Sequence, residues 1–489
     1  MSCGAVRYQC SLSVGLNSSS TKRRTKKVDR APLCAPIGPK AIHLGIRDVR
    51  VRASSLTGGR ASVGGDRKVA SFRSVRCRVA GSNDSVPAGG DATFEQSLFN
   101  SVNILLGVGL LSVPYAIAEG GWAALLVLLI LGLTTNYTGK ILIKCQESQC
   151  LLPDDSLEPG CVPLGSYEAV GEAAFGPLGR KIITSVLYTE LIGTCGLFFI
   201  LEGDHISVLL NSGPESKVMI MIASALVMVP TTWFRDLSGL SKLGFLGACA
   251  SFGMLGVILY TFVSGGGLAG ASPEAISSAS LVHAGGLPLT FGLLAFVFAG
   301  HAVFPNIYIS MEDRSRYPEL LQRTYVIVGA TCAAVGVLGY LMYGDSVADE
   351  VTLNLPAGAL STIALMLTVI NPLAKFGLTM APVVRGFDQQ FGLEGEDKAM
   401  QSIVGRTGLG FFALVLATSV PDFALFMALL GSFLTLTVSI IFPSLCYLKI
   451  FGPGLSQQEK WLNYFTVGLG CFCAVSGTTA AITGLQSGT

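Results

Sequence analysis

Two glycine–proline pairs stand at matching places in long apolar stretches of the sequence. Gly109 is followed five residues later by Pro114, and Gly300 is followed five residues later by Pro305. Glycine destabilises a helix and proline removes one of its hydrogen bonds, so each pair predicts a break in an apolar helix. In hydrocarbon, the freed backbone groups must line a cavity or be buried in protein. The pairs therefore predict a ligand site built from backbone groups.

Three ionisable side chains, Glu190, His301 and Lys375, lie in the middle of apolar stretches. An ionisable group inside a bilayer is costly and usually has a function. His301, beside Gly300, is placed to relay protons or to select a ligand side chain, and a neutral histidine bound to the backbone is the structural alternative. For Glu190 and Lys375, the structural alternative is an ion pair with each other.

The composition places these residues in a membrane protein. Of the 489 residues, 51% are hydrophobic and 13% are charged, whereas soluble proteins carry about 25% charged residues. Residues 1–90 hold 17 of the 33 Lys and Arg, so few basic side chains remain in the other 399 residues. A soluble globule could not cover its surface with so few. We predict an all-α integral membrane domain over residues 91–489, with the lipid bilayer as its surroundings, and a basic tail over residues 1–90.

Apolar runs long enough to cross a bilayer as helices, about 20 residues each, recur along the membrane domain. We expect eleven transmembrane helices, over residues 97–117, 121–143, 182–202, 217–234, 239–263, 285–309, 323–343, 361–385, 403–420, 422–448 and 461–484. The connections on the side of the tail carry fourteen Lys and Arg, and the opposite connections carry only Lys217. By the positive-inside rule, the amino terminus faces the cytoplasm.

The basic tail has two interpretations. It is rich in Ser, Arg and Gly and poor in acidic residues, which suits either a disordered cytosolic tail or an organellar transit peptide with a processing region at 75–80. Beside a membrane domain, this charge indicates an orientation signal or an address rather than a nucleic-acid partner. The thirteen cysteines are spread over the tail, one connection (Cys145, Cys150 and Cys161) and apolar stretches, so we expect no disulfide framework.

The two broken helices are the first and the sixth of the predicted spans. An odd number of spans between equivalent helices inverts the second copy, so the spacing predicts a 5+5 inverted repeat followed by one extra helix. Glycine and proline also serve close packing in membrane helices, which is the alternative. The paired placement favours the repeat, with a site at the unwound segments.

Three stretches resemble the amino acid/auxin permease family, particularly its plant and fungal vacuolar amino acid transporter branch. They are the run 100–122 with its Gly107-Val108-Gly109-Leu110-Leu111-Ser112-Val113-Pro114 core, the run 298–308, and Tyr343-Gly344-Asp345 with 352–356. The resemblance covers residues 94–484. It implies a leucine-transporter-type fold and an amino acid substrate coupled to protons or, less often, to sodium. It also implies a vacuolar or other endomembrane location, for which the plastid envelope is the alternative.

For an amino acid ligand, the two breaks offer complementary partners. The amino terminus of a half-helix suits the carboxylate, because its N–H groups are unpaired and its dipole end is positive. Carbonyl groups released at the second break suit the ammonium group. The predicted substrate-binding residues are Gly107, Val108, Gly109, Leu110 and Leu111 for the carboxylate, and Phe296, Ala299 and Gly300 for the ammonium.

In the fold that the resemblance implies, a coupling-ion site lies between the first and eighth spans. Lys375 belongs to the eighth span, where its ammonium group would stand in the place of sodium and its deprotonation would couple transport to protons. For a sodium-coupled carrier, Asn103 and Thr368 are the expected ligands, although Asn103 also suits a hydrogen bond between helices. Glu190 and His301 complete the candidate ion-coupling residues.

The sequence lacks the residues that other classes of protein require. The four histidines are scattered, and the sequence contains neither a phosphate-binding Gly-x-x-x-x-Gly-Lys-Ser/Thr loop nor a His-Glu-x-x-His pair. We therefore expect no enzyme, no metal and no cofactor besides a coupling ion. A channel normally needs rings of carbonyls or charges. Two inverted halves suit a carrier with alternating access better than they suit such a ring. A sensor that binds amino acids with little transport stays as the remaining alternative.

Overall fold

The computed structural model describes residues 90–151, 161, 163–234, 238–272, 280–420 and 422–487. The predicted tail, with its processing region at 75–80, therefore lies outside the described residues, apart from Gly90. Within the described ranges the chain is helical, and its β-structure is limited to isolated bridges such as the one between Ala92 and Met311. The all-α prediction is confirmed.

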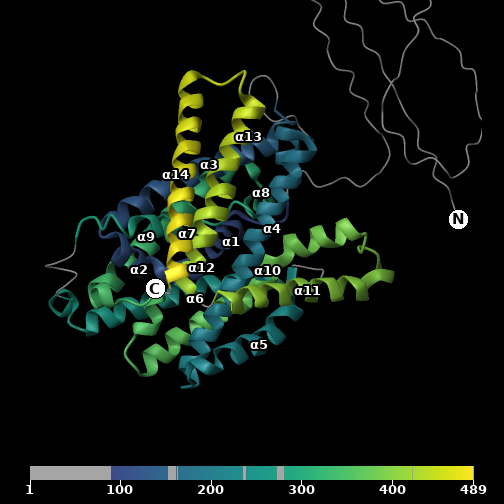
Figure 1. Cartoon of the computed structure of the whole chain (residues 1–489). Coiled ribbons are helices and arrows are strands. Elements are labelled where there is room, and N and C mark those ends of the chain that lie inside the picture. Colours follow the sequence, from purple (N-terminus) through teal and green to yellow (C-terminus); the bar gives the residue numbers. More distant parts are fainter. Residues whose placement is uncertain are drawn as a thin grey trace, which may run out of the picture. The chain divides into compact units, whose positions relative to one another are not determined.

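Helices of different lengths make up the membrane domain (Figure 1). The α-helices are α1 (Phe94–Leu105), α2 (Val113–Gly120), α3 (Ala123–Glu147), α4 (Tyr167–Leu209), α5 (Lys217–Met228), α6 (Ser238–Ser264), α7 (Leu287–Val297), α8 (Phe304–Ser310), α9 (Tyr317–Tyr343), α10 (Ala359–Phe391), α11 (Ala399–Ser419), α12 (Phe423–Leu429), α13 (Phe442–Phe451) and α14 (Gln457–Ser487). Short 3₁₀-helices include η1 (Val108–Ser112), η3 (Val229–Trp233) and η8 (Val351–Asn354), and two segments of π-helix are η10 (Leu430–Thr435) and η11 (Thr437–Ile441).

Most of the predicted spans are long, apolar helices in the structure. Over the described ranges, eight helices are long and apolar enough to cross a membrane, and a bent pair, Phe94–Leu105 with Val108–Gly120, makes nine. Two further apolar helices, Lys217–Trp233 and Leu287–Val297, are shorter. The prediction of many apolar membrane helices is confirmed at this level.

Both expected breaks are present. The first span bends by 48° between α1 and η1, at Leu106 and Gly107. The sixth is interrupted between α7 and α8, over residues 298–303. Pro114 and Pro305 lie in the first turn of α2 and of α8, where a missing N–H removes no helical hydrogen bond. The prolines thus begin the second half of each broken helix.

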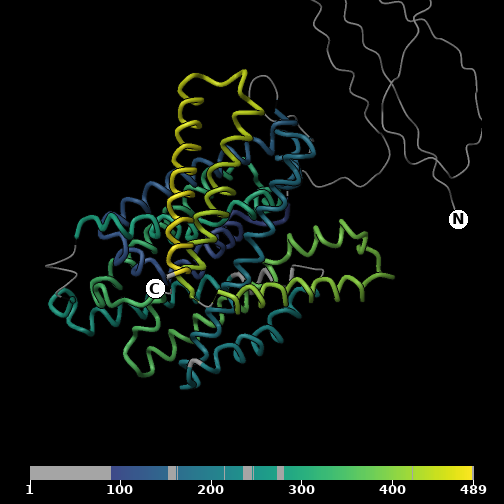
Figure 2. The backbone as a smooth tube through the Cα atoms, in the orientation of Figure 1, coloured from purple at the N-terminus to yellow at the C-terminus, as the bar shows by residue number. Residues whose placement is uncertain are grey.

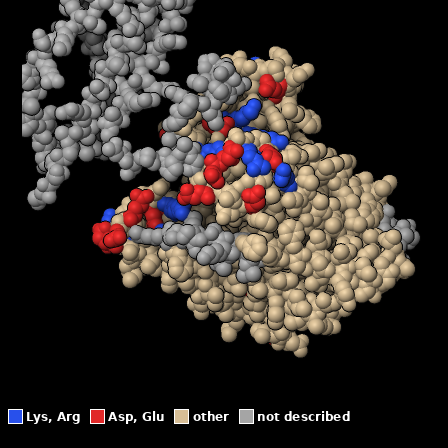
Figure 3. All heavy atoms as spheres, turned by 180° about the vertical axis from the view of Figure 1, so that it is seen from behind, with Lys and Arg blue, Asp and Glu red and all other residues tan. Residues whose placement is uncertain are grey.

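The outer surface suits a lipid environment. Figure 3 shows charged side chains gathered over part of one face, beside a broad area without charge. The last helix, α14, packs along α7, α12 and α13 and forms the yellow end of the chain in Figure 2. Its outer side exposes Trp461, Phe465 and Val475. Apolar surface of this extent is stable against hydrocarbon and unfavourable in water.

The expectation of no disulfide was wrong at one place. Cys150 and Cys161 are bonded, with their Cα atoms 5.5 Å apart. The chain turns directly after α3 and returns to it, since the N–H of Leu164 donates to the carbonyl of Gln146 at 2.9 Å. This return brings both cysteines within reach of each other. Seven other cysteines of the described ranges are free.

Candidate functional site

The first break presents free backbone donors. Gly107 donates to the carbonyl of Leu105 at 2.8 Å, and Leu110 donates to the carbonyl of Gly107 at 3.2 Å. The N–H groups of Val108 and Gly109 have no backbone acceptor in the described part of the chain. They lie in the first turn of η1, where a helix leaves its donors unpaired. These two residues supply the free N–H groups within the predicted carboxylate site.

The second break releases fewer carbonyls than the sequence predicted. The carbonyl of Phe296 accepts from the N–H of Ala299 at 3.1 Å, and that of Gly300 accepts from Val303 at 3.0 Å. The carbonyl of Ala299 has no backbone donor among the described residues. Of the three predicted partners for an ammonium group, Ala299 is therefore the one with an unpaired carbonyl.

The two breaks contact each other directly. A Cβ atom added to Gly109 would lie 3.2 Å from the Cα atom of Val297. A Cβ atom added to Gly300 would lie 2.7 Å from the Leu105 side chain. Both glycines are thus required for close approach of the broken helices. In this arrangement no room for an amino acid is left between them.

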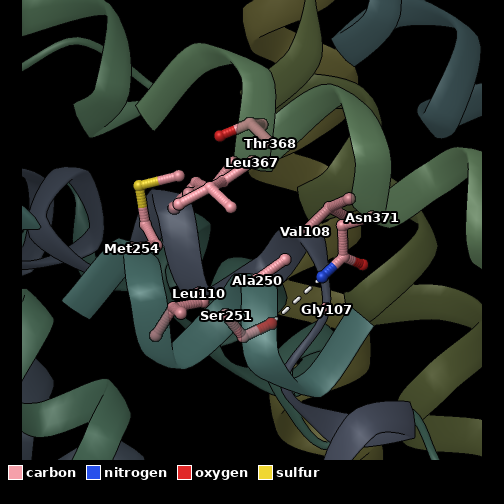
Figure 4. A pocket seen from close by; sticks show the side chains of 10 residues that line it. Gly107, Val108, Leu110, Ala250, Ser251, Met254, Leu367, Thr368 and Asn371 are labelled. Atoms are coloured by element: carbon pink, nitrogen blue, oxygen red, sulfur yellow. Dashed lines mark hydrogen bonds between the residues drawn. The ribbon is translucent and has the colours of Figure 1, made fainter. Parts of the chain in front are cut away.

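A small cavity lies against the first break, between η1, α6 and α10 (Figure 4). Its volume of about 20 Å³ holds about one water molecule. The lining residues are Gly107, Val108, Leu110, Leu111, Ala250, Ser251, Met254, Leu367, Thr368 and Asn371. The cavity therefore joins four of the five residues predicted for the carboxylate with Thr368, whereas Phe296, Ala299 and Gly300 are outside its lining.

Lys375 lies at the end of α1, beside this cavity. Its ammonium group donates to the carbonyl of Asn103 at 2.5 Å and to that of Leu106 at 2.9 Å. The last carbonyls of a helix are unpaired and carry the negative end of its dipole, so they stabilise a cation. The structure thus places the Lys375 ammonium group of the eighth span at the break in the first span.

A polar group from α6 completes this junction. The Ser251 hydroxyl donates to the carbonyl of Leu106 at 2.9 Å, and the Asn371 amide donates to Ser251 at 3.0 Å. The Leu106 carbonyl therefore accepts from both Lys375 and Ser251. Sequence reasoning missed Ser251, and its signal was a hydroxyl in an otherwise apolar stretch. The Asn103 side-chain oxygen is buried without a donor in the described ranges.

Glu190 lies elsewhere: it belongs to α4 and faces η10, a segment of π-helix. One of its oxygens accepts from the Thr435 hydroxyl at 2.7 Å, and the other has no hydrogen-bond partner among the residues described. The alternative of a structural Glu190–Lys375 ion pair is wrong. The two side chains face different helices, because Lys375 points at α1 while Glu190 points at η10.

His301 is buried in the second break and faces α3. Its Nε2 atom is 3.1 Å from the Thr138 hydroxyl, which donates to the carbonyl of Ser439 at 2.6 Å. Its Nδ1 atom has no hydrogen-bond partner within the described part of the structure. The ring packs against Phe304. His301 therefore belongs to a contact between α3, η11 and the second break rather than to the cavity.

The architecture is a leucine-transporter-type fold. The structure of MhsT in complex with L-phenylalanine is similar with a TM-score of 0.50 at 12% identity, covering 79% of this chain and 98% of that one. Mhp1, a nucleobase-cation-symport-1 family transporter, is similar with a TM-score of 0.51 at 10% identity, covering 82% of this chain and 92% of that one. At such low identity these likenesses concern the fold alone.

The sequence profile of the transmembrane amino acid transporter proteins matches residues 90–483. The chain therefore belongs to this family, the amino acid/auxin permeases, and is an amino acid transporter rather than an enzyme. Among its relatives in Arabidopsis thaliana, amino acid transporter AVT1D is 37% identical over 81% of this chain and 70% of that protein. Amino acid transporter AVT1J is 34% identical over 80% of this chain and 91% of that protein. The resemblance found in the sequence is confirmed.

Proposed function

We propose that this protein is a secondary carrier that moves neutral or other amino acids by alternating access, coupled to protons by symport or antiport. The observation that carries the proposal is the position of the Lys375 ammonium group, on the carbonyls of Asn103 and Leu106. Half-helix carboxyl ends with unwound carbonyls hold the coupling cation in carriers with broken helices. A lysine at that place carries a proton where other carriers bind a metal ion.

Substrate recognition in this proposal uses both breaks. The free N–H groups of Val108 and Gly109 hold the substrate carboxylate, and the unpaired carbonyl of Ala299 holds its ammonium group. The breaks touch each other through Gly109 and Val297. A substrate enters only when they separate, which is the movement that alternating access requires.

We also propose the finer membrane arrangement. The nine apolar spans are completed by Lys217–Trp233 and by α7 with α8, which gives eleven. The first five and the next five form inverted halves, α14 is the extra helix, and the amino terminus is cytoplasmic. The transport domain covers residues 91–489, and residues 1–90 form a tail or transit peptide. A vacuolar or other endomembrane is the favoured location, with the plastid envelope as the alternative.

A sodium-coupled carrier is the second candidate. Two observations favour it: the Asn103 side-chain oxygen is buried without a donor in the described ranges, and Thr368 lines the cavity. Oxygen atoms of this kind are ligands for hard cations. In that case Lys375 would be structural.

The test is uptake of radiolabelled amino acids into proteoliposomes under a pH gradient or a sodium gradient, with unlabelled amino acids as competitors. Saturable uptake driven by the pH gradient, with counterflow, supports the proton-coupled carrier. Sodium-driven uptake supports the second candidate and moves the ion to Asn103 and Thr368. Absence of uptake by correctly inserted protein overturns both and favours a sensor.

A further inference from the structure

A second group of buried ionisable side chains lies where α4 ends against the connection between α9 and α10. His205 belongs to the last turns of α4, and Glu350 directly precedes η8 in that connection. Both side chains are fully buried. Neither lines the cavity of Figure 4, and the transport site described above uses neither of them.

His205 joins α4 to the connection through both ring nitrogens. Its Nδ1 atom is 3.0 Å from the carbonyl of Leu201 and 3.4 Å from the Glu350 carboxylate. Its Nε2 atom is 2.6 Å from the Thr352 hydroxyl. The histidine therefore contacts the connection on both sides of Val351.

The Glu350 carboxylate lacks the partners that an ionised group needs. Neither of its oxygens receives a hydrogen bond from a described residue. Burying an ionised carboxylate without donors is strongly unfavourable. One proton on the pair removes its net charge, as a protonated Glu350 beside a neutral His205 or as a carboxylate beside an imidazolium. With no proton the pair is negative, and with two it is positive, so one proton is the favoured content.

The surroundings favour retention of this proton. The charged groups that act on Glu350 are Asp204 of α4, Lys217 of α5 and Asp349 of the same connection. Beyond them, Asp422 ahead of α12 lies near Asp204 and Asp349, Tyr115 of α2 with its neighbour Glu119 lies near Asp349, and the buried Glu202 precedes His205 by three residues in α4. The cation among them, Lys217, pairs with Asp204 at 2.7 Å, so negative charge is in excess. Burial, with Asp204 and Asp349 nearby, raises the pKa of Glu350 well above its ordinary value.

The connection also contacts the transport machinery. The short helix η8, between Glu350 and Leu355, packs against η1 of the broken first span and against α10. Val351 is fully buried and lies against α9, where a Cβ atom on Gly339 would be 3.1 Å from it. Release of the connection from α9 and η1 would therefore uncover Val351 and free a contact of η1.

We infer that His205 and Glu350 form a second proton-binding site, whose single proton fastens the 344–355 connection to α4 and against η1. This site goes beyond the proposed function, because it is separate from Lys375 and needs no substrate. Loss of the proton leaves an uncompensated buried carboxylate, and the connection is released so that Glu350 becomes hydrated.

The test is the labelling rate of a cysteine at the buried position, Val351→Cys, with a membrane-impermeant maleimide on the full chain in nanodiscs between pH 5.5 and 8. Thiol reactivity itself rises with pH, so the rate is divided by that of Ser346→Cys, an exposed position on the same connection. Protein with its native cysteines alone gives the background. For one released proton, the ratio rises up to about tenfold per pH unit above the pKa of the pair.

In the Glu350→Gln background the ratio is expected to stay at its low-pH value, because the amide is neutral at every pH. Asp345→Asn, which removes an exposed carboxylate from the same connection, is the matched control and keeps the rise. A constant ratio in the otherwise native chain, or an unchanged rise in Glu350→Gln, overturns the inference. A constant ratio in the otherwise native chain overturns the inference even if the Glu350→Gln variant does not fold. Because no amino acid is present, a failure of the carrier proposal leaves this readout intact.

Discussion

The ammonium group of Lys375 in α10 lies 2.5 Å from the carbonyl oxygen of Asn103 in α1. This contact joins a helix of the second half of the chain to the carboxyl end of the broken first helix. Both partners are buried, so the Asn103 carbonyl depends on the lysine for this hydrogen bond, while the lysine also donates to the Leu106 carbonyl. Any movement of α1 away from α10 therefore changes the environment of the lysine, and loss of its charge weakens the contacts that join α1 to α10.

Replacement of this lysine is expected to remove proton coupling. In Lys375→Ala, the Asn103 carbonyl loses its donor, and uptake is expected to become independent of pH and to fall about tenfold or more, as for loss of a charged hydrogen bond. The measurement is the pH profile of uptake in proteoliposomes. Lys398→Ala, which removes an exposed lysine, is the matched control. A native pH profile in Lys375→Ala would show that the lysine is structural.

The contact between the breaks predicts a cost for any side chain at Gly109. In Gly109→Ala the new methyl group meets the backbone of Val297 at 3.2 Å, which cannot move as a side chain can. We expect a loss of about 1–3 kcal/mol of stability from overpacking, and strongly reduced uptake. Thermal unfolding and uptake are measured together. Gly329→Ala in α9, where a Cβ atom meets nothing within 4 Å, should leave uptake unchanged and should not lower stability, because alanine favours a helix more than glycine does.

The same reasoning applies to Gly300, where Val is expected to abolish uptake while membrane insertion persists. Its first side-chain carbon would already meet Leu105 at 2.7 Å. Expression, insertion and uptake are scored separately, against native protein. Normal transport by Gly300→Val would mean that the second break serves packing alone.

The Glu190–Thr435 hydrogen bond predicts a non-additive pair of mutations. Thr435→Val leaves the buried carboxylate without a donor and is expected to lower stability by about 1–3 kcal/mol. The double variant Glu190→Gln with Thr435→Val should lose less than the sum of the single variants. The free energies of unfolding of all four proteins provide the measurement. Simple additivity would contradict a direct interaction.

Asp349 predicts a dependence of stability on acidity. Burial, with Asp422 and Asp204 nearby, raises the pKa of this carboxyl group from 3.8 to about 6 in the folded protein. When folding raises the pKa of a group, the group contributes its full stabilisation at any pH below the pKa that it has in the unfolded chain. That contribution is lost as the pH rises from about 4 through about 6. The melting temperature of native protein should therefore fall across this window more than that of Asp349→Asn. Asp345→Asn should follow native protein.

Composition and local pattern were enough to predict the membrane class and both breaks. The length of the apolar runs and the scarcity of charged residues can be counted directly from the sequence. The effect of Gly109 or Pro305 on its own helix is local. The family resemblance depended on the same short stretches. These properties require no knowledge of which helices are neighbours.

The partners of the polar side chains depended on the packing of the helices. A step of one residue turns a side chain by about 100° around its helix, so depth in a span does not tell which neighbour the side chain meets. For this reason Glu190 meets Thr435 rather than Lys375, and the partners of Ser251 and His205 could not be predicted from their positions along the chain. The Cys150–Cys161 bond likewise depends on how the chain returns to α3. Contacts between distant segments arise only when the helices pack.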